Sequence, residues 1–166
     1  MGFRLPLLVL VLVLASCQGQ TPKSSAAPAG VYALPDVALL TLDQKRVSLP
    51  VLLRGRPALV NLWATWCDAC EREFDALNRL NQRVASRAFV LGVAVGEPHE
   101  KIESFARERG INYPLVVDES FAFADAIGSQ RLPTTLVIGK DGRVLLRSGE
   151  LDAATLEAFS RAIQAY

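Results

Sequence analysis

The stretch Trp63-Ala64-Thr65-Trp66-Cys67-Asp68-Ala69-Cys70 places two cysteines three residues apart. Residues 58–64, which lead into them, form an apolar run typical of a strand buried on both faces. Residues 71–80 follow with apolar side chains at helical spacing. The cysteine pair therefore lies where a buried strand passes into a helix, which favours a reactive thiol pair over a structural one.

The spacing of the two cysteines suits thiol–disulfide exchange, which needs one thiolate that attacks and a second thiol that resolves the mixed disulfide. Cys67 is expected at or near the N-cap, where free backbone N–H groups lower a cysteine pKa from about 8.5 to about 3.5–7.5. Cys70, one turn further on, suits the resolving role. Because Asp68, Glu71 and Glu73 crowd the same helix end, we expect only a moderately lowered pKa and a reducing pair.

The composition limits the classes of function. The chain has 166 residues, which fits one domain with a short appendage, and 51% of them are hydrophobic. Lys and Arg number 18 and Asp and Glu 17, so there is no basic field to attract nucleic acid. The chain has a single histidine, His99, which argues against a His-rich metal site, and we expect no metal and no cofactor. His99 itself is expected at the surface. The third cysteine, Cys17, needs a role of its own.

The N-terminus has the features of a secretory signal over residues 1–16. Its apolar segment, residues 5–14, is too short for a bilayer, which needs about 20 residues. Leu14-Ala15-Ser16-Cys17 resembles the lipobox of bacterial lipoproteins and predicts lipidation of Cys17. Residues 17–33 then form a flexible tether rich in Ser, Ala, Pro and Gly. We therefore expect an extracytoplasmic protein, anchored by lipid to a bacterial membrane and facing the periplasm.

The remaining residues, 34–166, alternate between apolar strand patterns and amphipathic helix patterns. The expected elements, in order, are a hairpin over 37–49, a strand over 58–64, a helix over 70–87, a strand over 89–95, a helix over 100–109, a short apolar segment at 114–117, a helix over 121–127, a hairpin over 134–147 and a helix over 153–164. This order predicts an α/β fold with a central mixed sheet flanked by helices.

Four segments carry a family resemblance. They are Val60–Cys70, the stretch from Gly92 to Pro114, Leu132-Pro133-Thr134-Thr135, and Gly139–Val144. Their joint order and spacing resemble the thioredoxin-like, membrane-anchored extracytoplasmic proteins of the TlpA/ResA type. The resemblance implies a thioredoxin fold over residues 34–166, with an N-terminal hairpin and a helical insertion.

The resemblance also implies roles for individual residues. Pro133 is expected to follow a cis peptide bond, and Leu132 to offer its backbone to an incoming peptide by strand addition. Trp66 would line the same substrate groove beside Cys67. Glu97 falls where the family keeps an active-site glutamate, suited to take the proton of the second cysteine.

Two residues depart from the family pattern. Ala69 stands where a proline often precedes the second cysteine, so the start of the helix is less rigid. Asn61 stands where thioredoxin has a buried aspartate behind the thiols. That carboxylate is therefore not the proton acceptor in this chain.

The sequence thus predicts a protein thiol–disulfide oxidoreductase that acts mainly as a reductase through a redox-active Cys67–Cys70 disulfide. Disulfide-bonded proteins are the expected substrates. A membrane or periplasmic thiol donor is expected upstream, because the outside of the cell is oxidising. The protein is expected to be a monomer.

Two other functions of the cysteine pair stay open, and the residues argue against three more. A thiol peroxidase of the thiol-specific antioxidant class stays open, although it typically has Thr three residues before the attacking cysteine, where this chain has Ala64. A non-catalytic lipoprotein that only binds a partner also stays open. A zinc site lacks further ligands, a structural disulfide this short closes almost no loop, and a copper-delivery protein usually spaces its cysteines more widely.

Overall fold

The computed structural model describes residues 1–2, 32–84 and 86–165. Most of the expected signal segment, Cys17 and nearly all of the tether lie outside the described residues. The sheet begins at β1 (Tyr32–Ala33), two residues before the expected start of the domain at Leu34. Within the described part of the chain, no helix is both long and apolar enough to cross a bilayer.

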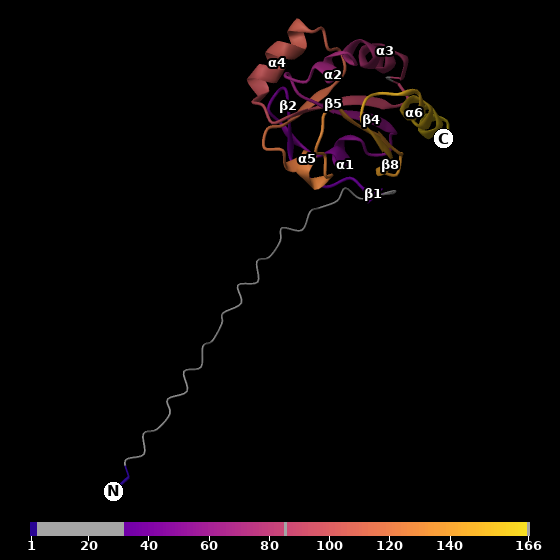
Figure 1. Ribbon diagram of the computed structural model, residues 1–166. Coiled ribbons are helices and arrows are strands. Elements are labelled where there is room, and N and C mark those ends of the chain that lie inside the picture. The colour runs from indigo at the N-terminus through magenta and orange to yellow at the C-terminus, as the bar shows by residue number, and fades with distance from the viewer. Residues whose placement is uncertain (3–31, 85, 166) are drawn as a thin grey trace.

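Eight strands of the described residues form one mixed sheet (Figure 1). They are β1 (Tyr32–Ala33), β2 (Leu39–Thr41), β3 (Arg46–Val47), β4 (Ala58–Trp63), β5 (Phe89–Val95), β6 (Leu115–Asp118), β7 (Thr134–Ile138) and β8 (Arg143–Ser148). Their order across the sheet is β1-β8-β7-β4-β5-β6-β2-β3. β4 is flanked by β5, which is parallel, and by β7, which is antiparallel. Because Leu62 pairs with Thr134, Pro133 comes level with the residues that lead to Cys67.

Helices cover both faces of the sheet. They are α1 (Leu49–Leu52), α2 (Asp68–Glu71), α3 (Phe74–Val84), α4 (His99–Glu108), α5 (Ala122–Ala126) and α6 (Ala153–Gln164). One core cluster joins Trp63 to side chains of α3, α4 and α6, and the other joins Leu62 to side chains of α1 and α5. Alternate residues of β4 thus point into opposite cores, as the pleat of a strand requires. The predicted mixed sheet flanked by helices is confirmed.

The first hairpin is present but shorter than predicted, since β2 and β3 pair over only a few residues. The end of its expected second strand instead enters α1, which has proline in its first turn. Proline is favoured there because its fixed φ suits a helix start and its missing N–H is not needed. The short apolar segment before α5 is the parallel strand β6.

The single helix predicted over residues 70–87 is wrong in its bounds. Helix begins at Asp68, breaks after Glu71 and resumes at Phe74. At the break the N–H of Glu73 bonds to the carbonyl of Cys70 at 3.0 Å, a tightened turn that carries the Glu73 side chain inward. The later helix ends at Val84, whose carbonyl accepts the N–H of Arg87.

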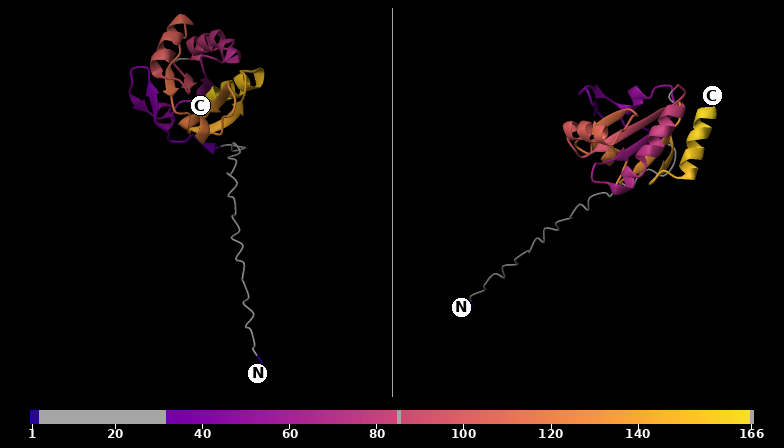
Figure 2. Two further views of the ribbon diagram at one scale, coloured as in Figure 1. Left: turned by 60° about the vertical axis from the view of Figure 1, so that its left-hand side comes forward. Right: turned by 90° about the horizontal axis from the view of Figure 1, so that it is seen from above.

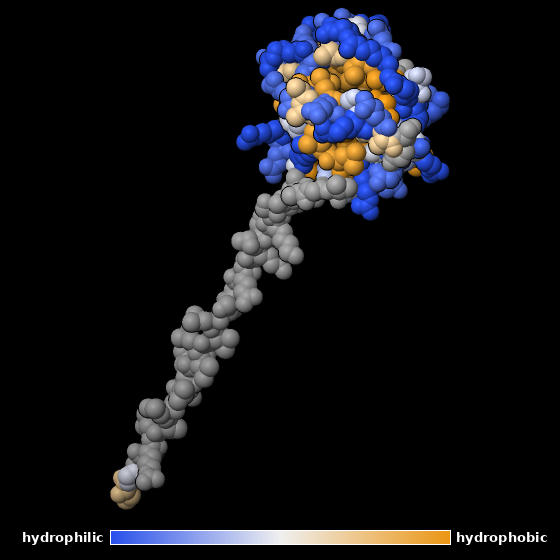
Figure 3. Space-filling model, turned by 90° about the vertical axis from the view of Figure 1, so that its right-hand side faces the viewer, coloured by the Kyte–Doolittle hydropathy of each residue, from blue (hydrophilic) through white to orange (hydrophobic). Residues whose placement is uncertain are grey.

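The helices α3 and α6 lie side by side (Figure 2) and enclose a groove lined by Leu80, Val84, Leu156, Phe159 and Ile163 together with polar side chains. Figure 3, drawn from the α6 side, shows apolar residues on this face with polar residues between and around them. This groove takes no part in the site described below.

Candidate active site

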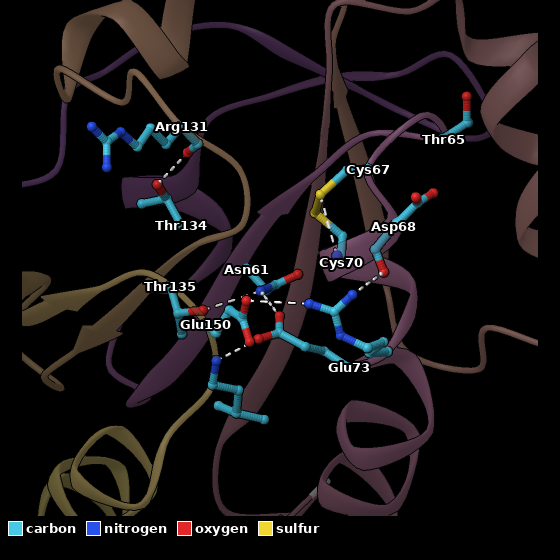
Figure 4. The surroundings of a disulfide bond; sticks show 12 residues. Asn61, Thr65, Cys67, Asp68, Cys70, Glu73, Arg131, Thr134, Thr135 and Glu150 are labelled. Atoms are coloured by element: carbon cyan, nitrogen blue, oxygen red, sulfur yellow. Dashed lines mark hydrogen bonds and ion pairs between the residues drawn. A yellow bond between two sulfur atoms is a disulfide. The ribbon is translucent and has the colours of Figure 1, made fainter.

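Cys67 and Cys70 are joined in a disulfide at the start of α2 (Figure 4). Cys67 is the N-cap of α2, and its Sγ accepts a hydrogen bond from the backbone N–H of Cys70 at 3.2 Å. Cys67 is 8% exposed and Cys70 is fully buried, so an incoming sulfur meets Cys67 first. Because α2 is a single turn, local N–H groups rather than a long helix dipole stabilise a thiolate on Cys67.

Glu73 is a buried carboxyl on the inner side of this disulfide, and only 7% of it is exposed. The Nδ2 of Asn61 donates to its Oε2 at 3.0 Å, and the backbone N–H of Leu151 donates to its Oε1. Burial raises the pKa of Glu73 above the ordinary glutamate value, and these two hydrogen bonds only partly offset that rise. A carboxyl with a raised pKa one turn after Cys70 is suited to exchange a proton with that cysteine.

From the sequence, Glu73 is one of three acids at the helix end, and no role in proton transfer is predicted for it. The signal that could have found it is its spacing. Glu73 comes three residues after Cys70, and residues so spaced lie on one face of a helix. A side chain on the face of a buried cysteine points into the protein.

Asn61 holds Glu73 in place from the central strand. Its Nδ2 also donates to Oγ1 of Thr135 at 3.1 Å, which ties β4, β7 and the turn after α2 together. Its Oδ1 is buried and has no hydrogen-bond partner among the described residues. Figure 4 shows Asn61, Thr135 and Glu73 together beneath the disulfide. The buried carboxyl of this site thus comes from the helix side, with an amide on the strand.

Glu97 follows β5 and is also buried, but its contacts differ from those of Glu73. Its carboxylate accepts the backbone N–H of Thr65 at 2.7 Å and the hydroxyl of Thr65 at 2.6 Å, and it pairs with Lys101 at 2.5 Å. Burial raises the pKa of Glu97, but the bonds from Lys101 and Thr65 outweigh it and hold the pKa below the ordinary value. The carboxylate therefore fixes the loop that leads to Cys67.

The predicted substrate-binding residues lie around Cys67. Trp66 is 63% exposed, and Trp66 and Leu132 line one hollow of about 380 Å³. The peptide bond between Leu132 and Pro133 is cis, as the resemblance implies. Pro133 is buried and lines a neighbouring hollow instead. Trp63, the last residue of β4, is a packing residue, and its ring centroid lies 5.1 Å from that of Phe74.

The prediction that His99 lies at the surface is wrong. The residue is 8% exposed at the start of α4, and its Nε2 lies 3.1 Å from Nε2 of Gln44. Its backbone N–H bonds to the carboxylate of Glu119. The first hairpin thus contacts the ring and the loop after β6 binds the backbone, and both segments lie far from His99 in the sequence.

Known proteins resemble both the sequence and the structure of this chain. The sequence profile of the AhpC/TSA family matches residues 32–147. The thiol-disulfide oxidoreductase ResA of Geobacillus thermodenitrificans is 34% identical over 143 residues, which cover 82% of this chain and 81% of that protein. The chain belongs to the ResA family. ResA of Bacillus subtilis is 31% identical over 112 residues, which cover 67% of this chain and 62% of that protein.

Solved structures share the fold of this chain. A putative thiol:disulfide interchange protein DsbE from Chlorobium tepidum superposes with a TM-score of 0.71 at 23% identity, covering 82% of this chain and 96% of its own. A thioredoxin family protein from Chlorobium tepidum TLS gives 0.66 at 29% identity, covering 82% and 99%. The thioredoxin fold is therefore confirmed, and this ResA-family protein is a thiol–disulfide oxidoreductase.

Proposed function

We propose that this ResA-family protein reduces disulfides in proteins outside the cytoplasm while tethered to a bacterial membrane. The observation that carries the proposal is the asymmetry of the pair. Cys67 reaches the surface, whereas Cys70 is buried on the side of Glu73, a carboxyl whose pKa burial raises. The two cysteines are thus suited to the attacking and resolving roles.

In the proposed reaction, the thiolate of Cys67 attacks one sulfur of a substrate disulfide. A mixed disulfide forms, and the other substrate sulfur leaves as a thiolate and takes up a proton. Cys70 then gives its proton to Glu73 and attacks the sulfur of Cys67. The Cys67–Cys70 disulfide forms, and the second substrate thiol leaves with a proton. Two electrons pass from the enzyme to the substrate. Of the two protons, one comes from Cys70 and is passed on by Glu73 to a leaving substrate sulfur, and the other comes from solvent, because Cys67 reacts as the thiolate.

The charges near Cys67 favour the reducing direction, in which the reduced enzyme gives up electrons readily. Asp68 is exposed beside Cys67 and makes no ion pair among the described residues, so it disfavours the thiolate. The charge of Glu71 is offset by a salt bridge to Arg109 at 2.5 Å. A less stable thiolate means a less stable reduced form, which is the property of a reductant. A reduction potential near that of the strong oxidant DsbA, about −120 mV, would exclude this direction.

Glu97 remains a predicted site residue, and its contacts support a positioning role. An ionised carboxylate that binds both the N–H and the hydroxyl of Thr65 holds the loop before Cys67 in one conformation. The same contacts argue against a peroxidase, since the hydroxyl of Thr65 is taken by Glu97. We therefore expect hydroperoxides to be turned over at a negligible rate compared with disulfides.

The substrate groove is proposed to run over Trp66 and Leu132, with Pro133, which lines the neighbouring hollow, at its edge. An exposed indole next to the attacking cysteine offers apolar contact area, and the strand end at Leu132 offers backbone groups. A protein segment in mixed disulfide with Cys67 would lie across these residues. We propose that the enzyme acts as a monomer and receives electrons from a membrane or periplasmic thiol donor.

The membrane tether rests on the sequence, since Cys17 lies outside the described residues. The proposal expects wild-type protein in the membrane fraction of a bacterial host and Cys17→Ser protein in the soluble extracytoplasmic fraction. Two acyl chains are needed for stable anchoring, so loss of the acylated cysteine should release the protein fully. A Cys17→Ser protein that stays in the membrane would exclude lipid anchoring through this residue.

An insulin-reduction assay tests the function directly. Wild-type protein supplied with dithiothreitol should accelerate insulin reduction, and Cys67→Ser should abolish the acceleration. The Cys70→Ser variant should accumulate mixed disulfides, because the resolving thiol is absent. A wild-type protein that binds partners but does not accelerate reduction would be the non-catalytic lipoprotein instead.

A further inference from the structure

An apolar hollow continues from the attacking cysteine toward α5. Its volume is about 380 Å³, and its lining includes Trp66, Val95, Phe121, Ala124, Arg131 and Leu132. Trp66 is the neighbour of Cys67 in the chain, and Leu132 precedes the cis proline. Any segment bound in mixed disulfide to Cys67 has this hollow beside it.

The far wall of the hollow is the ring of Phe121, which the backbone holds in an unusual conformation. Phe121 has φ +63°, in the left-handed region that bulky residues rarely adopt. Its ring lies over Gly96, where an added Cβ would come within 2.0 Å of the ring Cζ. Yet Phe121 is 44% exposed. A large ring kept half-exposed by left-handed backbone and a facing glycine is typical of a binding surface rather than of core packing.

The polar residues that line the hollow, Ser129, Gln130 and Arg131, are consecutive in the loop before Leu132. Arg131 is the only charged residue among those that line it, and its side chain makes no ion pair among the described residues. Figure 4 shows Arg131 extending from the loop before the cis proline, away from the disulfide. The hollow thus offers apolar walls and one cation, Arg131, which also lines the neighbouring hollow.

We propose that this hollow is a specificity pocket for protein substrates that carry an aromatic or branched apolar side chain within two residues of the half-cystine, followed by a carboxylate. The apolar side chain lies between Trp66 and Phe121, and the carboxylate meets Arg131. The volume of about 380 Å³ is at the low end of the range for ligand sites, about 300–1,000 Å³, and has room for one large side chain. The inference rests on the proposed function and deepens it by naming the substrate class.

Disulfide-linked peptides test the pocket. Each peptide carries one Phe or one Ser, scanned over the positions up to two residues from the cysteine, with Glu or Lys next to it. At one position at least, kcat/KM should favour Phe over Ser by about tenfold, the lower end of discrimination by an apolar pocket. Equal kcat/KM for Phe and Ser at every position would overturn the proposal.

Phe121→Asn removes the ring and keeps a residue that tolerates the left-handed conformation, so the fold should persist. The preference for Phe should disappear in this variant. The matched control is Leu145→Ser, at an equally exposed apolar residue outside the hollow, which should keep the preference. A preference that survives Phe121→Asn, or that is lost in Leu145→Ser, would count against the pocket.

Arg131→Glu tests the charged end independently of Phe121. The wild type should favour Glu over Lys next to the Phe, and the variant should favour Lys. Indifference to this charge would overturn the part of the proposal that assigns a carboxylate to Arg131. Turnover of a small disulfide, hydroxyethyl disulfide, by the wild type distinguishes failure of the specificity pocket from failure of the proposed function. Turnover without peptide preference defeats the pocket alone, and absence of any turnover defeats the proposed function.

Discussion

The amide Nδ2 of Asn61 donates a hydrogen bond to Oε2 of Glu73 at 3.0 Å, and both side chains are buried behind the disulfide. The pair joins the strand before the two cysteines to the turn after them. An amide here holds the carboxyl without competing for its proton, since an asparagine does not titrate. Replacing the strand aspartate of thioredoxin by asparagine therefore leaves the site with a buried carboxyl that comes from another element.

Glu73→Gln should slow disulfide reduction at pH 7 about a hundredfold, because general acid–base groups contribute about 10²–10⁴ in rate. The fall should lie in the resolving step, seen as a longer-lived mixed disulfide in rapid-mixing experiments. Glu103→Gln, at an exposed residue paired with Arg107, is the control and should change the rate less than about threefold. An equal rate in wild type and Glu73→Gln would show that Cys70 loses its proton elsewhere.

The stability of the oxidised protein should depend on pH through Glu73. Its pKa is raised in the folded state above the ordinary value of 4.5. The stability it contributes is therefore fully present below about pH 4.5 and is lost as the pH rises through the raised pKa. Urea unfolding between pH 4 and 8 measures this slope, which Glu73→Gln should reduce. A wild-type unfolding free energy that rises steadily over this range would contradict the assignment.

Asn61→Asp should place two carboxyls within hydrogen-bond distance of each other in a buried site. Like charges so close raise the pKa of one of them strongly. We expect the unfolding free energy to fall by about 3 kcal/mol near pH 8, the order of an uncompensated buried charge. At pH 5 the loss should be smaller, because the two groups then share a proton. If the unfolding free energy falls equally at pH 8 and at pH 5, repulsion between the two carboxylates is not the cause of the fall.

Glu97→Gln should slow reduction about tenfold by loosening the loop before Cys67, and Thr65→Val should do the same. Both changes remove the same contact, the hydrogen bond between the Thr65 hydroxyl and the Glu97 carboxylate. Their effects on the rate should therefore not add in the double variant. The reduction potential of the pair should shift in each, which a loss of packing elsewhere would not produce. If rate and potential both stay at wild-type values in Glu97→Gln, the positioning role is excluded.

Much of the architecture could be read from local pattern. The apolar run of β4, the alternation of strands and helices, and the place of Cys67 at a helix start follow from residue type and spacing, and the cis bond before Pro133 follows from a resemblance in sequence. Helix bounds were harder, because the break after Glu71 is fixed by where one side chain is buried.

The sequence by itself determined the redox pair, since two cysteines separated by a helical turn need only local backbone geometry to meet. The tertiary structure alone decided how the two acids near the pair are bound and in which direction their pKa values shift. Glu73 is turned inward by contacts with Asn61 and Leu151, and Glu97 is bound to Thr65. The carboxyl pKa values depend on burial and hydrogen bonds between segments far apart in the chain, which no local pattern contains.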